Sequence, residues 1–98
     1  MEQLPTISSY GQYRSGNYGV NSLQVSFGNG LTLYYSYDTI IAFCGRDGLK
    51  VRVNDWSTTT GKHLNWIDGA GKAKANRLEG EEFINLLKQE LEYHNLLN

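Results

Sequence analysis

Apolar and polar residues alternate with a period of two from residue 22 onward, and this pattern predicts β-strands. Residues 22–27 place Leu23, Val25 and Phe27 between polar side chains, as a half-buried strand does. Residues 31–36 repeat the pattern after a Gly-Asn-Gly turn, and residues 49–53 repeat it with basic side chains on the polar positions. Residues 39–44 form a short apolar run rich in β-branched side chains, which predicts the most buried strand. Because the turns are short, the four strands should form an antiparallel meander.

The period changes to that of an amphipathic helix near residue 79 and predicts a helix over residues 79–97. One stripe at helical spacing carries Phe83, Ile84, Leu86, Leu87, Leu91 and His94. Glutamates at the start of this segment suit the positive end of the helix dipole. We therefore predict an α+β domain, in which an antiparallel β-meander of about four strands is packed by one C-terminal amphipathic helix.

The first 21 residues follow neither period and are rich in serine, glycine, tyrosine and asparagine. They predict a flexible or loosely docked N-terminal arm, residues 1–21, before a single α+β domain, residues 22–98. The arm carries Tyr10, Tyr13 and Tyr18. Their rings either contact a partner or a base, or cover the edge of the domain's own core. Residues 69–76 are small and basic and predict a flexible loop.

Charge is divided unevenly along a chain whose net charge is only -1. Residues 46–77 contain seven Lys or Arg and three Asp, a net of +4, whereas residues 79–98 contain five Glu and one Lys, a net of -4. The overall charge argues against a protein that coats nucleic acid, because such domains are usually strongly basic. The division favours a local anion site or a head-to-tail contact between subunits, or simply two solvated faces.

Cysteine usage and the N-terminal residues limit the class further. Cys44 is the one cysteine of the chain, so neither an internal disulfide nor a cysteine-based zinc site is expected. The first residues show no basic segment followed by an apolar run, so we expect no signal peptide, no membrane span and a cytoplasmic location.

The segment from Trp56 to Asp68 is the strongest candidate for a binding site. Both tryptophans of the chain lie in it, separated by consecutive hydroxyl side chains, a lysine, a histidine and an asparagine. Hydroxyl, ammonium and imidazole groups donate hydrogen bonds to anions, and indole rings stack on flat rings. The predicted ligand-binding residues are Arg52, Trp56, Thr58, Thr59, Thr60, Lys62, His63, Asn65 and Lys72, with Tyr34, Tyr35 and Tyr37 as further stacking rings. In the alternative interpretation, the threonines begin a short helix and the indoles belong to the core.

Catalytic and metal chemistry find little support in the sequence. Cys44 with His63 can form a nucleophile and base, but Cys44 lies in the apolar strand run, where a free cysteine usually acts as a small hydrophobe. Asp38, Asp55 and Asp68 show no recognised metal-ligand spacing. Residues 69–72 lack the spacing and the hydroxyl of a phosphate loop. We therefore expect no enzyme, no metal and no cofactor.

Two motifs resemble a family of small proteins encoded by bacteriophages and other mobile elements. The first is the run Tyr-Ser-Tyr-Asp-Thr-Ile-Ile-Ala-Phe at residues 35–43, and the second is Trp-Ser-Thr-Thr-Thr-Gly-Lys-His-Leu-Asn at residues 56–65. The segment at residues 77–83 is similar to the start of the terminal helix in that family. The resemblance covers about residues 23–91. It implies a setting rather than an activity, because the family is largely uncharacterised. The setting it implies is host defence, since phage accessory proteins often counter host immunity.

These observations lead to three functional hypotheses. The first is a counter-defence protein, a sponge that sequesters a small anionic ligand such as a nucleotide immune signal, at the interface of a homo-oligomer. The second is an anti-CRISPR-type inhibitor of a host defence protein, motivated by the glutamate-rich helix and the tyrosine-rich arm. The third is a single-stranded nucleic-acid-binding protein. We expect Lys62 and His63 to serve function more than folding; the competing interpretation buries His63 in a polar network with Asp55 or Asp68.

Overall fold

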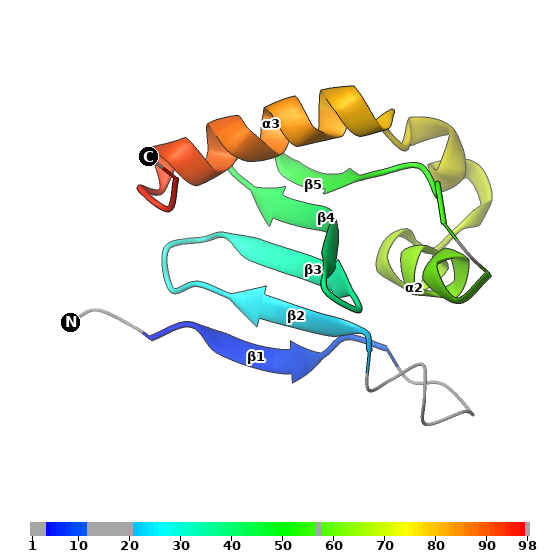
Figure 1. The fold of residues 1–98 in the computed structure, drawn as a ribbon, viewed down its shortest axis with the longest axis horizontal. Coiled ribbons are helices and arrows are strands. Elements are labelled where there is room, and N and C mark those ends of the chain that lie inside the picture. Colours follow the sequence, from blue (N-terminus) through cyan, green and yellow to red (C-terminus); the bar gives the residue numbers. More distant parts are fainter. Residues whose placement is uncertain (1–3, 12–20, 57, 98) are drawn as a thin grey trace.

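The computed structural model describes residues 4–11, 21–56 and 58–97 and shows an antiparallel sheet with helices packed against it (Figure 1). The sheet has five strands in the order β1-β2-β3-β4-β5. They are β1 (Thr6–Ser9), β2 (Leu23–Ser26), β3 (Thr32–Ser36), β4 (Thr39–Gly45) and β5 (Gly48–Val51). The helices formed by the described residues are α2 (Thr58–Asp68), the 3₁₀ helix η1 (Gly71–Asn76) and α3 (Gly80–Tyr93). The predicted α+β class is confirmed, with one strand more than the predicted four.

A β-bulge in β4 decides which side chains face each side of the sheet. Tyr34 pairs with Ala42 and Tyr35 pairs with Ile40, so Ile41 between them has no partner in β3. An extra residue of this kind interrupts the strict alternation of side chains. As a result, Ile41 and Ala42 both belong to one apolar cluster, while Ile40 packs against the other.

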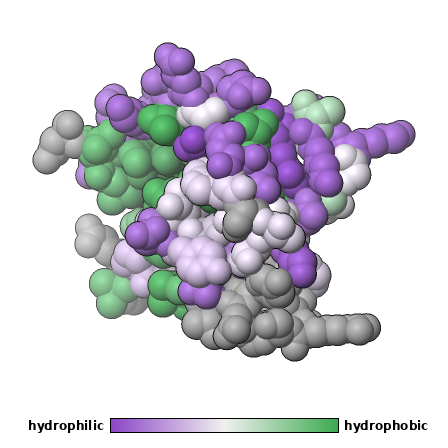
Figure 2. All heavy atoms as spheres, turned by 45° about the vertical axis from the view of Figure 1, so that its right-hand side comes forward, coloured by the Kyte–Doolittle hydropathy of each residue, from purple (hydrophilic) through white to green (hydrophobic). Residues whose placement is uncertain are grey.

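Helix α3 covers one face of the sheet through the stripe that the sequence predicts. Phe83 and Leu87 are buried in a cluster with Leu31, Leu33 and Phe43. Burying each of these side chains stabilises the fold by about 1.5–3 kcal/mol. The outer surface of α3, at the top of Figure 2, is mainly hydrophilic. The helix is therefore amphipathic as predicted, except that Ile84 of the predicted stripe is 39% exposed.

Helix α2 packs against the opposite face. Its Leu64 is fully buried against Ile41, Ala42 and Val51, on the face that the bulge supplies. The segment between the two tryptophans is thus largely helical, and η1 follows it where the sequence predicts a flexible loop. Arg77 ties this region together, because its Nε donates a hydrogen bond of 2.7 Å to the buried Asp68 carboxylate.

The described part of the N-terminal segment lies along the sheet edge. Strand β1 pairs with β2, with Ile7 opposite Val25. The Tyr10 hydroxyl then donates a 2.8 Å hydrogen bond to the Tyr35 carbonyl, and the Tyr10 ring meets Tyr34 edge-on. Tyr10 therefore covers part of the sheet, whereas Tyr13 and Tyr18, with the rest of residues 12–20, lie outside the described residues.

Candidate functional site

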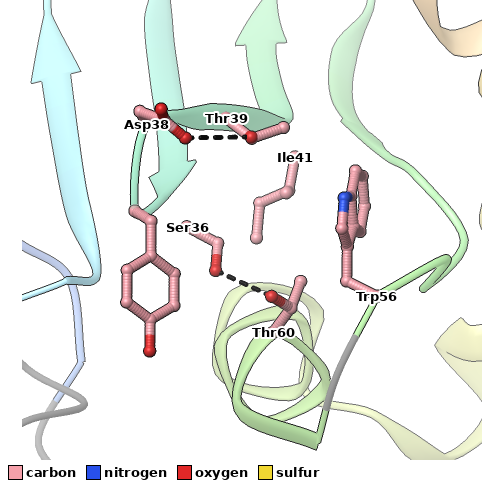
Figure 3. A pocket seen from close by; sticks show the side chains of 7 residues that line it. Ser36, Asp38, Thr39, Ile41, Trp56 and Thr60 are labelled. Carbon is pink, nitrogen blue, oxygen red and sulfur yellow. Dashed lines mark hydrogen bonds between the residues drawn. The ribbon is translucent and has the colours of Figure 1, made fainter.

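An open pocket lies where the turn between β3 and β4 meets the first turn of α2 (Figure 3). It has a volume of about 450 Å³, within the usual range for small-molecule sites. Its lining residues are Ser36, Tyr37, Asp38, Thr39, Ile41, Trp56 and Thr60. Figure 3 shows Trp56 standing along one side, with Ile41 beside it and Asp38 and Thr39 along a separate rim. The pocket thus combines two aromatic rings with hydroxyl groups and one carboxylate.

The charge of this lining bears on what can bind. Among the described residues, Asp38 is the one charged residue of the lining, and no lysine, arginine or histidine of these residues lines the pocket. The Thr39 hydroxyl donates a long hydrogen bond of 3.4 Å to the Asp38 carboxylate. A carboxylate repels phosphate and accepts hydrogen bonds from donors. The pocket itself therefore suits a ring with N–H or O–H donors rather than an anionic group.

Tyr37 has the most unusual backbone conformation in the pocket. Its φ is 57°, in the left-handed region that bulky residues rarely adopt. The conformation costs on the order of 1–3 kcal/mol. The surrounding structure holds it in place, because the Tyr37 amide donates a 2.9 Å hydrogen bond to the Asn21 carbonyl. The side chain nevertheless remains 54% exposed, so core burial does not account for a tyrosine at this strained position.

A buried polar network supports the pocket from behind. The Ser36 hydroxyl lies 3.0 Å from the Thr60 hydroxyl and 2.7 Å from Nδ1 of His63. All three side chains are buried, and that of His63 is fully inaccessible. The rings of Tyr10 and Tyr37 also contact the imidazole. Buried polar groups of this kind are stable because they are hydrogen-bonded to one another, so His63 holds β3 and α2 together.

The predicted ligand-binding residues are only partly brought together. Trp56 and Thr60 line the pocket. Arg52 lies next to it, with its guanidinium 4.7 Å from the centre of the Trp56 ring and 3.3 Å from the Asp55 carboxylate. The other members, which do not line the pocket, are Thr58 and Thr59 in the first turn of α2, the exposed Lys62, the buried His63, Asn65, and the exposed Lys72 of η1.

Asn65 and the neighbouring Asp68 have a structural partner. Arg77 Nη2 donates a 3.1 Å hydrogen bond to Asn65 Oδ1, and the same guanidinium binds Asp68. Burial raises the pKa of Asp68, but hydrogen bonds from Arg77 and from the Ala70 amide, together with the Arg77 charge, outweigh burial and hold this pKa below its usual value. Asp68 therefore remains an anion paired with Arg77 at neutral pH.

The pocket residues of the β3–β4 hairpin are the ones that the sequence did not place in the site. They are Ser36, Asp38, Thr39 and Ile41, while Tyr37 was predicted only as one of several stacking rings. One local signal was present. A two-residue hairpin loop normally uses Gly, Asn or Asp where φ is positive, and a tyrosine there is a departure that calls for an explanation.

The predicted acidic surface of α3 is divided in the structure. Glu79, Glu81 and Glu82 are exposed at its beginning, whereas Glu90 is 5% exposed. Glu90 accepts hydrogen bonds from the Arg46 amide at 3.1 Å and pairs with His94 Nε2 at 3.0 Å. A partner that binds acidic side chains would therefore contact the first turn of α3 rather than Glu90.

The described residues, 4–11, 21–56 and 58–97, contain no group of three or more His, Cys, Asp or Glu side chains arranged to hold a metal ion. None of the helices formed by these residues has both the length and the apolar character needed to cross a membrane.

No curated protein and no solved structure shows a significant match to the chain. A family of unknown function, DUF8033, matches residues 6–85. This match extends from β1 into α3 and includes the whole pocket lining. The chain therefore belongs to the DUF8033 family of unknown function.

Proposed function

We propose that this protein is a non-enzymatic binding module whose pocket takes the ring of a small, nucleotide-like ligand beside Trp56 and Tyr37. The observation that carries the proposal is the strained, half-exposed Tyr37 at the pocket. Backbone strain of this kind gathers at ligand-binding positions. Trp56, at 42% exposure, presents a second ring to the same pocket. Base stacking on an aromatic side chain contributes about 1–3 kcal/mol per base.

The proposal assigns the ring, and not the phosphates, to the pocket. A phosphate beside the Asp38 carboxylate would be repelled, and none of the described lining residues carries a basic side chain to offset this repulsion. The phosphate groups of a bound nucleotide would therefore extend from the pocket into solvent. Nucleoside and nucleotide should then bind with similar affinity, which distinguishes this site from a phosphate-binding loop.

The biological setting we propose is the sequestration of a nucleotide signal of host defence by a phage or mobile-element protein. Support for this setting comes from the sequence resemblance at residues 35–43 and 56–65. Those two runs contain every lining residue of the pocket. A sponge needs affinity and no turnover, and this requirement agrees with a pocket built from stacking rings and hydrogen-bonding groups.

The test is isothermal titration calorimetry with nucleosides, nucleoside monophosphates and cyclic dinucleotides. Tyr37→Gly and Trp56→Ala should each weaken the binding of the best ligand by about fivefold to a hundredfold, because each removes one stacking ring. Tyr37→Gly should not lower the melting temperature, because glycine adopts a positive φ without strain.

Tyr93→Ala is the matched control for the tyrosine substitution. Tyr93 is 58% exposed, close to the exposure of Tyr37, and does not line the pocket. Its replacement should leave affinity unchanged. Absence of heat with every compound of the panel would refute the proposal, as would unchanged affinity in both Tyr37→Gly and Trp56→Ala.

A further inference from the structure

The rim of the pocket carries a carboxylate that the fold does not use. Asp38 is exposed, and no salt bridge joins it to any residue of the described ranges. Within the described residues, its side chain accepts one hydrogen bond, from the Thr39 hydroxyl, which is 3.4 Å long and therefore weak. Asp55, Asp68 and Glu90, by contrast, each pair with an arginine. Asp38 is thus available to a ligand.

Thr39 and Asp38 present a defined order of hydrogen-bonding groups along this rim (Figure 3). The Thr39 hydroxyl donates its one hydrogen weakly to Asp38 and can turn to donate it to a ligand instead, whereas the two oxygens of Asp38 can only accept. Next to one another, they offer one donor followed by two acceptors. A ring held against Trp56 or Tyr37 would have to meet this order with its polar edge.

Among the common bases, guanine matches this order. The edge of guanine that carries O6, N1–H and the 2-amino group presents one acceptor followed by two donors. Adenine and cytosine would each place a ring-nitrogen acceptor against the carboxylate, and uracil would place its O2 there. An unpaired or repelled polar group in a binding site is costly. We infer that Asp38, assisted by Thr39, makes the pocket selective for a guanine base.

This inference rests on the proposed ring-binding function and adds the identity of the ring. The stacking residues do not distinguish one base from another, because every base has a π-face. Selectivity must therefore come from the rim. Asp38 acts here as a specificity-determining residue. Its removal should weaken the binding of guanine more than the binding of the other bases.

The experiment compares three ligands that share the same ribose and phosphate. Calorimetry with GMP, IMP and AMP should rank affinity in that order, because IMP lacks the 2-amino group and AMP also lacks the N1–H donor. Asp38→Asn should weaken GMP binding about tenfold or more and should remove most of its preference over AMP. Thr39→Val, which keeps the shape and removes the hydroxyl, should weaken GMP binding by a smaller factor.

Asp47→Asn is the matched control, because Asp47 is also exposed and lies in the next turn of the sheet, between β4 and β5. It should bind GMP as the unaltered protein does, and all variants should keep their melting temperature. Equal affinity for the three nucleotides, unchanged in Asp38→Asn, would overturn the inference and leave the ring-binding function standing. Binding of none of them would overturn both. Tighter binding of tetramethylammonium than of GMP, lost in Asp38→Asn, would overturn the inference by identifying a cation site.

Discussion

At the scale of single residues, the neighbouring His63 and Tyr37 differ in what they contribute: His63 to the stability of the fold and Tyr37 to the proposed binding. The His63 imidazole is fully buried and hydrogen-bonded to Ser36, so it connects β3 to α2. The Tyr37 ring contacts it at 6.1 Å between centroids but remains half-exposed on a strained backbone. Burial and satisfied hydrogen bonds point to folding, whereas exposure combined with strain points to binding. The two residues therefore need different measurements.

We expect His63→Ala to lower the free energy of unfolding by about 1–3 kcal/mol, because Ser36 loses a buried hydrogen-bond partner and the site loses packing. Lys62→Ala, one residue earlier on the exposed side of α2, should change it by no more than about 0.5 kcal/mol. Urea unfolding at neutral pH measures both. Equal stability of the two variants would contradict a structural role for His63 and favour the functional role that the sequence predicts.

At the scale of elements, Glu90 fastens the end of α3 to the turn between β4 and β5. Arg46 donates to Glu90 from its amide and from Nε, and the Arg46 guanidinium lies 3.6 Å from the centre of the Tyr93 ring. The approach requires a glycine in the strand. A β-carbon on Gly45 would lie 2.6 Å from the Glu90 carboxylate carbon. The absence of a side chain at Gly45 therefore allows the helix and the strand to be joined.

Gly45→Ala should lower the free energy of unfolding by about 1–3 kcal/mol, the usual cost of overpacking. The same substitution in a Glu90→Ala background should cost clearly less, because the carboxylate that it meets is gone. Chemical denaturation of the four proteins of this double-mutant cycle gives the coupling energy directly. If Gly45→Ala costs the same in both backgrounds, its effect comes from the backbone of β4 and not from Glu90.

At the scale of the whole molecule, two buried carboxylates link the fold to pH. Asp68 joins α2 to the segment that follows η1, and Glu90 joins α3 to the sheet. Burial raises the pKa of Glu90, but hydrogen bonds from the Arg46 amide, from His94 and from the Arg46 side chain outweigh burial and keep this pKa below its usual value. For both groups the folded-state pKa therefore lies below that of the unfolded chain.

A lowered folded-state pKa gives a stabilisation that is complete above the unfolded pKa, about 4 for these groups, and that disappears as the pH falls through the folded-state value. The contribution of these two carboxylates to the free energy of unfolding should thus be constant from neutral pH to about pH 5 and should fall below about pH 4. Urea unfolding between pH 7 and pH 2 measures this dependence. The Asp68→Asn, Glu90→Gln double variant should be less stable at neutral pH and should show a shallower acid decline; a decline as steep as that of the unaltered protein would assign it to other groups.

Periodicity was sufficient to predict most of the fold. The alternation at Leu23, Val25 and Phe27 and the helical stripe at Phe83 and Leu87 both predict elements that the structure contains, because a half-buried element must follow its own geometric period. Strand β1 was not predicted. It is short, fully exposed and made mostly of serine and threonine, so pairing with β2 forms it without an apolar pattern.

Some residues of the candidate site could likewise be predicted from local sequence, and others only from the tertiary structure. The sequence by itself determined that Trp56 and Thr60 belong to an unusual segment, because their chemistry is visible in neighbouring residues. Tertiary structure alone decided that Tyr37, Asp38 and Thr39 share a pocket with them, since the β3–β4 turn meets α2 only after the sheet has formed. It also decided that His63 is enclosed while Lys62 is exposed. On a helix, adjacent side chains point about 100° apart, and only the position of the sheet determines which of the two is buried.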